Sequence, residues 1–68
     1  MSDDADLPIL LGALKDAHPH VRRDAAKTVG QLGAKGKEAM PSLQSLLKDK
    51  EPAVRNAAQK ALSQIAGK

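Results

Sequence analysis

Cysteine and aromatic residues are both missing from this sequence of 68 residues. Without cysteine the chain can form no disulfide and no thiolate metal site, so we expect a reducing, cytoplasmic setting. Without phenylalanine, tyrosine and tryptophan it lacks the side chains that stack on nucleobases. These absences disfavour disulfide-rich scaffolds, thiolate metal proteins and proteins that bind nucleic acid by stacking.

No hydrophobic run in the sequence approaches the ~20 residues that a membrane-spanning helix needs. The first six residues include three aspartates and lack the basic and apolar pattern of an export signal. We therefore expect neither a membrane span nor export, and we expect residues 1–6 to form an acidic, flexible N-terminus.

The chain is long enough for one small domain, and domains of this size keep a large fraction of their surface exposed to solvent even when folded. With no aromatic rings, the core must come from Leu, Ile, Val, Met and many alanines, and the small side chains contribute only about 1 kcal/mol each. Such a core is small for a solitary monomer. We therefore expect the chain to form a homo-oligomer or to be part of a longer array.

An internal repeat with a period of 33 residues dominates what the sequence does contain. Residues 7–35 and 40–68 form 29 aligned pairs, of which 12 are identical. The identities include Lys15-Asp16 against Lys48-Asp49. A period of this length is typical of stacked-repeat proteins, in which each unit is one supersecondary element.

The first half of the unit predicts an amphipathic helix that starts near residue 7. Leu7, Leu10, Leu11 and Leu14 are spaced i, i+3, i+4, i+7 and so share one face. We expect Asp6 to cap this helix, Pro8 to lie in its first turn, and the helix to end near residue 17.

The second half predicts another helix over residues 19–32. Pro19 suits the first helical position, Gly33 suits the position after the last turn, and an apolar stripe lies between them. The members of this stripe are Val21, Ala25, Val29 and Leu32. The stretch 33–37 has two glycines and two lysines and reads as a link with nothing to bury.

The second unit repeats this plan and completes an all-α fold. One helix carries Met40, Leu43, Leu46 and Leu47, and a second begins at Pro52, carries Val54, Ala58, Leu62 and Ile65, and ends at Gly67. Short connections make neighbouring helices antiparallel, so we expect two helical hairpins side by side. The expected organisation is a flexible segment 1–6, repeat one at 7–35 and repeat two at 36–68, in one folded domain.

The order Lys-Asp, turn, Pro-x-Val-Arg occurs twice in phase, and it resembles the HEAT and HEAT-like (armadillo-type) repeat family. The resemblance implies a short right-handed α-solenoid that acts as a non-catalytic scaffold for protein–protein interaction. It also implies a structural ladder between repeats, formed by Asp16, Arg22, Asp49 and Arg55. Arginine suits such a role because its carboxylate pairs tolerate partial burial.

A polar strip on the second helix of each unit is the candidate partner-binding surface. Its expected members are Arg23, Lys27, Gln31, Asn56, Lys60 and Gln64. With a net charge of +3, such a strip suits an acidic peptide or helix. The plain alternative is an ordinary solvated face. The alternative of another class is weak binding to a nucleic-acid backbone through this basic face, together with Lys35, Lys37 and Lys50.

A second candidate surface lies on the first helix of each unit. Ile9 and Ala13 lie opposite Leu7 and Leu14, and the second unit has Leu46 at the place of Ala13. If exposed, Ile9, Ala13 and Leu46 would serve self-association. Alternatively, they fill the interface between the two hairpins.

Catalytic and metal-binding constellations are not evident. His18 and His20 form a His-Pro-His turn, but a zinc site needs three or four ligands and no cysteine is available. The glycines at 30, 33 and 36 follow a predicted helix, whereas phosphate loops follow a strand. No serine lies in a nucleophile elbow. We therefore expect no enzymatic activity, no cofactor and no metal.

Overall fold

The computed structural model describes residues 3–67, with their side chains from Leu7 onward. This part of the chain forms the α-helices α1 (Asp3–Ala13), α2 (Pro19–Gln31), α3 (Met40–Leu46) and α4 (Pro52–Ala66), and the 3-10 helix η1 (Gly33–Ala39). It contains no strand. The prediction of an all-α fold is confirmed.

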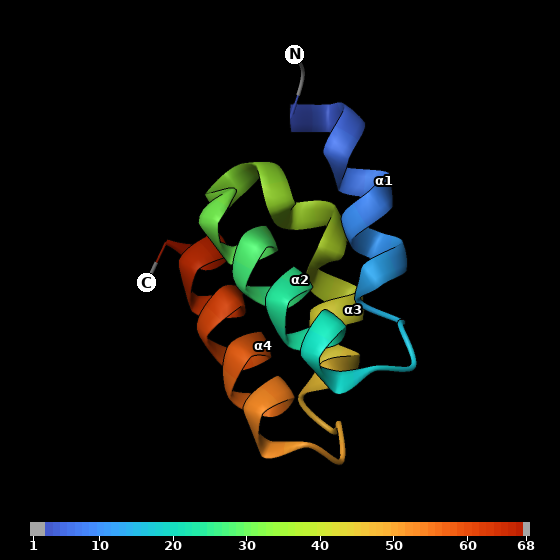
Figure 1. The fold of residues 1–68 in the computed structure, drawn as a ribbon. Helices are drawn as coiled ribbons and strands as arrows, with labels where there is room; N and C mark the ends of the chain where they lie inside the picture. Colours follow the sequence, from blue (N-terminus) through green and yellow to red (C-terminus); the bar gives the residue numbers. More distant parts are fainter. Residues whose placement is uncertain (1–2, 68) are drawn as a thin grey trace.

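The helices form two layers, with α2 and α4 in one and α1 and α3 in the other (Figure 1). Helices α2 and α4 run side by side in the same direction and share the most extensive contact of any two elements. Helix α1 packs on α2, and α3 packs on α4. Each repeat is therefore a helical hairpin, and the two hairpins are joined mainly through α2 and α4.

Prolines begin the two long helices as predicted. Pro19 and Pro52 occupy the first position of α2 and α4, where the missing N–H has no partner within the helix to lose. The preceding His18 and Glu51 are extended, with ψ of 123° in both, which is the conformation that proline favours in its neighbour. Gly67 ends α4 in the left-handed region at φ 77°.

Helix α1 begins earlier than the sequence indicated. We expected a start near Leu7 with Pro8 in the first turn, but α1 starts at Asp3 and contains Pro8 in its interior. Proline there removes one intrahelical hydrogen bond, yet its fixed φ is compatible with a helix. Favourable start signals at residues 6 and 8 therefore did not prevent the helix from extending toward the N-terminus.

The connection between the repeats is ordered and partly buried, contrary to the expectation of a link with nothing to bury. Residues 33–39 form η1, in which Gly36 and Ala39 are buried. A Cβ atom on Gly36 would lie 2.8 Å from the carbonyl oxygen of Val29 and 3.3 Å from Cδ1 of Ile65. Glycine is needed here because the backbone of η1 passes close to α2 and α4.

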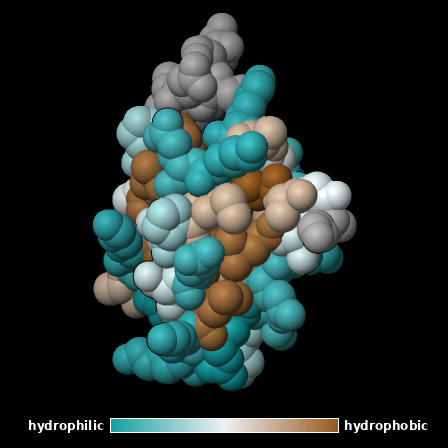
Figure 2. All heavy atoms as spheres, turned by 180° about the vertical axis from the view of Figure 1, so that it is seen from behind, coloured by the Kyte–Doolittle hydropathy of each residue, from teal (hydrophilic) through white to brown (hydrophobic). Residues whose placement is uncertain are grey.

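The core draws side chains from all four helices and from η1. Its buried apolar members are Leu7, Leu14, Ala25, Ala26, Val29, Ala39, Leu43, Leu46, Val54, Ala57, Ala58, Ala61 and Ile65. Two residues that we expected on the inner stripes are outside it, since Val21 is 37% and Leu47 is 40% exposed. Figure 2 shows a band of hydrophobic surface down the face opposite to that of Figure 1.

Helices α2 and α4 approach each other closely at Gly30. A Cβ atom at this position would lie 2.8 Å from Cα and 3.0 Å from Cβ of Ala61. Gly30 is buried beneath Gln64 and Ala61. The absence of a side chain at residue 30 therefore sets the distance between the repeats.

We predict that Gly30→Ala lowers the free energy of unfolding by about 1–3 kcal/mol, because the added methyl group meets the backbone of Ala61. The matched control is Gly12→Ala in α1, where an added Cβ meets nothing within 4 Å. That variant should gain less than about 1 kcal/mol from helix propensity. Urea unfolding followed by circular dichroism measures both, and equal effects would show that the close approach is not a constraint.

Candidate functional site

Each hairpin turn is closed by the aspartate that follows its first helix. Oδ1 of Asp16 accepts a hydrogen bond from the backbone N–H of His18 at 2.9 Å. Oδ1 of Asp49 accepts one from the N–H of Glu51 at 3.0 Å. Both contacts are of the type that lets aspartate stabilise a turn two residues ahead, so the repeated Lys-Asp pair has a local structural role.

One arginine joins the two repeats. Arg22 donates from Nε to Oδ2 of Asp49 at 2.7 Å and from Nη2 to Oδ1 at 3.1 Å, which makes a bidentate pair. Its Nη1 donates to the carbonyl oxygens of Asp16 at 2.7 Å and Ala17 at 3.0 Å. The side chains of Arg22 and Asp49 are only 12% and 8% exposed. Arg22 thus ties its own turn to the turn of the next repeat.

The other two ladder residues lie at opposite ends of the stack. Arg55 donates from Nη1 to the carbonyl oxygen of Asp49 at 2.6 Å, which repeats the contact of Arg22 with Asp16. Among the residues that the structure describes, the Arg55 guanidinium has no carboxylate partner and the Asp16 carboxylate has no arginine partner. The expected ladder therefore consists of one inter-repeat ion pair with a free half at each end.

The hydrogen bonds from the Arg22 guanidinium lower the pKa of Asp49 below its ordinary value of 3.8. Partial burial opposes this effect by favouring the neutral acid, while the Glu51 N–H and the charges of Arg22 and Lys50 add to the lowering. Asp49 therefore carries its negative charge in the folded protein throughout the neutral pH range.

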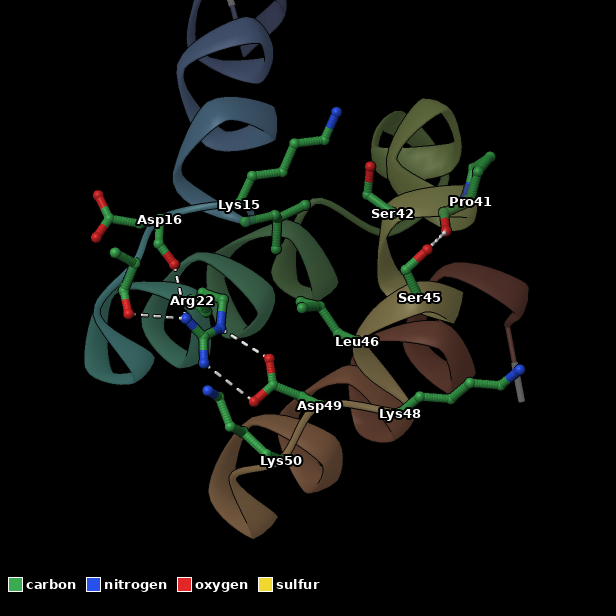
Figure 3. A pocket seen from close by; sticks show the side chains of 12 residues that line it. Lys15, Asp16, Arg22, Pro41, Ser42, Ser45, Leu46, Lys48, Asp49 and Lys50 are labelled. Carbon is green, nitrogen blue, oxygen red and sulfur yellow. Dashed lines mark hydrogen bonds and ion pairs between the residues drawn. The ribbon is translucent and has the colours of Figure 1, made fainter.

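An open cleft of about 900 Å³ lies between the turn that follows α1, residues 14–17, and helix α3, beside this ion pair (Figure 3). We call it the α1–α3 cleft. Leu14 and Leu46 line its inner part, and Lys15, Lys48 and Lys50 are on its rim. Lys15 reaches from the end of α1 toward α3, whereas Lys48 points away from the ion pair (Figure 3). Sequence reasoning missed this cleft, although the recurrence of Lys15 as Lys48 was visible.

A smaller groove of about 90 Å³ lies between α2 and α4. Its lining residues are Lys27, Gln31, Ala57, Lys60 and Gln64, and we call it the α2–α4 groove. The structure thus brings together four of the six residues of the expected strip. They form two side-by-side pairs, Lys27 with Lys60 and Gln31 with Gln64, because α2 and α4 run in the same direction.

The two remaining strip residues lie outside this groove. Arg23 is half-buried and contacts the neighbouring Asp24 at 3.2 Å. Asn56 is exposed but does not line the groove.

The expected self-association residues are not all on the surface. Ile9 is 71% exposed, and Ala13 is half-buried against the core. Leu46 is a core residue with an exposure of 7%, so the expectation that it is available for docking is wrong. It packs in the core cluster, to which both hairpins contribute side chains.

Reactive side chains do not converge in the described part of the chain. His18 and His20 are exposed, and the side chains described for residues 7–67 include no group of three or more that could bind a metal ion. Within the same range, no helix combines the length and hydropathy needed to cross a bilayer. The described surface therefore offers two depressions and three exposed large apolar side chains, Ile9, Val21 and Leu47.

The family model for HEAT repeats matches residues 7–68. The match covers both hairpins and includes both Asp-x-x-Pro-x-Val-Arg turns. No curated protein and no solved structure matches the chain.

We predict that Asp49→Asn lowers the free energy of unfolding at pH 7 by about 2–3 kcal/mol, because the Arg22 guanidinium loses its charged partner. Asp49 binds its proton less tightly in the folded than in the unfolded state. Its ion pair therefore stabilises the fold above pH 3.8, and this contribution is lost as the pH falls through the lower pKa of the folded state.

Urea unfolding of the parent and the variant at several pH values between 7 and 3 tests this prediction. The difference between their free energies of unfolding should become smaller toward pH 3. The matched control is Asp24→Asn, which removes an exposed pair with Arg23 and should cost less than about 1 kcal/mol. A difference that does not change with pH would contradict the assignment to Asp49.

Proposed function

The chain belongs to the HEAT-repeat family, and from this premise we propose that it binds an acidic segment of a partner protein in the α2–α4 groove. HEAT repeats generally mediate protein–protein interactions and are typically non-catalytic scaffolds. The observation that carries the proposal is that Lys27 and Gln31 of α2 line one groove together with Lys60 and Gln64, their counterparts on α4.

The chemistry of the α2–α4 groove supports an extended acidic ligand. Two ammonium groups offer attraction to carboxylates, and two side-chain amides can donate to and accept from a peptide backbone. Ala57 supplies an apolar floor between them. A groove of about 90 Å³ is too small to enclose a metabolite, so the ligand lies across it, as a helix or strand of a partner does.

The α1–α3 cleft competes for the same class of ligand. It is larger than the α2–α4 groove, and its rim carries Lys15, Lys48 and Lys50. Two carboxylates, Asp16 and Asp49, also line this cleft and offset part of its positive charge, whereas the α2–α4 groove is lined by no carboxylate. The unopposed positive charge favours the α2–α4 groove for an acidic partner.

The remaining expectations about assembly and setting stay predictions. Self-association now rests on Ile9 and the hydrophobic band of Figure 2, because Leu46 is buried. The cytoplasmic setting rests on the absence of cysteine.

The alternative function is binding to a nucleic-acid backbone through the basic residues of α2 and α4. It is less well supported, because Arg23 is engaged with Asp24 and the chain has no aromatic side chain for stacking on bases. Phosphate contacts would make the affinity fall steeply with salt. Labelled single-stranded and duplex oligonucleotides at about 50 mM salt should therefore show no binding, and a salt-sensitive complex would favour this alternative.

We predict that Lys27→Glu with Lys60→Glu weakens binding of an acidic ligand at least about 10-fold, because two attractive contacts become repulsive. The probe is a fluorescein-labelled amphipathic peptide of about 20 residues with a glutamate face, followed by anisotropy at about 50 mM salt.

The matched control is Lys15→Glu with Lys48→Glu, which changes the net charge equally but acts on the α1–α3 cleft. This control should weaken binding less than about 3-fold. Equal losses in both variants would indicate attraction to overall charge. A larger loss in the control would move the binding site to the α1–α3 cleft.

A further inference from the structure

The contact between the repeats depends on small residues that face each other. On α2 the inner positions are Ala26 and Gly30, and on α4 they are Ala57 and Ala61. All four are buried. Since an added Cβ on Gly30 would lie 2.8 Å from Cα of Ala61, this helix spacing leaves no room for a larger side chain.

The 33-residue period identifies the equivalent positions on the two outer faces. On α4, Gln59 and Ser63 stand where α2 has Ala26 and Gly30. On α2, Asp24 and Thr28 stand where α4 has Ala57 and Ala61. These four outer side chains are polar and exposed, although the inner side chains at the same repeat positions are small and buried.

We propose that these four polar residues are end caps that stop a second copy of this chain from continuing the stack. A second copy placed by the same operation that relates the two repeats would set Ser63 against Thr28, and Gln59 against Asp24. Ser63 would then stand at the place of Gly30, where an added Cβ lies 2.8 Å from the Cα atom of the facing residue. The copies are therefore held apart, and the close contact that joins the repeats cannot form between chains.

The ion-pair ladder does not close the ends. Arg55 and Asp16 are the unpaired halves of a rung like the one between Arg22 and Asp49, and they would meet in a stacked pair of chains. In the single chain Arg55 is exposed and Asp16 is half-buried, so without helix packing around them their ion pair would contribute little. The four cap residues block stacking, and their replacement by small residues gives each outer helix the side chains that the inner contact has at the same repeat positions.

The test uses two variants that each open one end. The α4-end variant carries Gln59→Ala and Ser63→Gly, and the α2-end variant carries Asp24→Ala and Thr28→Ala. Every chain also carries Ile9→Ser, so that the exposed isoleucine makes no contribution. Light scattering coupled to gel filtration then gives the mass at each concentration, relative to 7.1 kDa for one chain.

Each one-end variant alone should have the same mass as the parent with Ile9→Ser. An equimolar mixture of the two should double in mass and stop there, because the outer ends remain capped. A chain that carries all four cap substitutions should form a series whose mean mass grows with concentration, because its heterologous contact does not close. Adding Arg55→Gln to the α4-end variant should weaken the mixed dimer by removing the rung to Asp16.

Circular dichroism and thermal melting establish that each variant is folded. If Ser63→Gly unfolds α4, the pair Ser63→Ala and Thr28→Gly tests the same contact with the glycine on the other helix. Folded one-end variants that do not associate when mixed would overturn the proposal. So would a parent with Ile9→Ser that already forms a growing series.

Discussion

The close packing of α2 against α4 is the constraint on which the rest of the structure depends. A chain without aromatic residues gains little area from each side chain, so it must bring backbones near one another to exclude water. Gly30 against Ala61 provides this approach, and the Arg22–Asp49 pair fixes the same two hairpins at the level of the turns. Apolar contact and a bidentate ion pair thus specify one relative position of the repeats.

That position also creates the candidate binding surface. Because α2 and α4 are parallel and in register, residues one period apart lie beside each other, and a single solvent-facing lysine in the unit becomes a pair. Lys27 with Lys60 and Gln31 with Gln64 arise in this way. The side chains that line the groove are ordinary lysines and glutamines. They can act together on one ligand because the repeat places equivalent residues of α2 and α4 at a fixed distance from each other.

Periodicity and proline placement were sufficient to predict four α-helices, the starts of α2 and α4, and the end of α4 at Gly67. These features depend on local backbone chemistry. Tertiary effects account for the rest. Gly36 looked like a flexible link because its burial depends on how closely η1 passes Val29. The buried arc of α2 is rotated away from Val21, because residues 25, 26, 29 and 30 face the core and α4. A helical wheel centred on the largest apolar residues could not locate this arc.

Positions that are identical in the two repeats and positions that differ between them have different structural roles in this fold. Positions that are identical in the two units, such as the lysine at 27 and 60, form rows across the surface or the rung between turns. Positions that differ distinguish inside from outside, as where glycine at 30 corresponds to serine at 63. A perfect repeat would present to solvent the same small-residue surface that it uses internally, and its copies would add to one another without limit. Departure from the period is therefore as informative as the period, because it separates positions that pack between the two repeats from equivalent positions that face solvent.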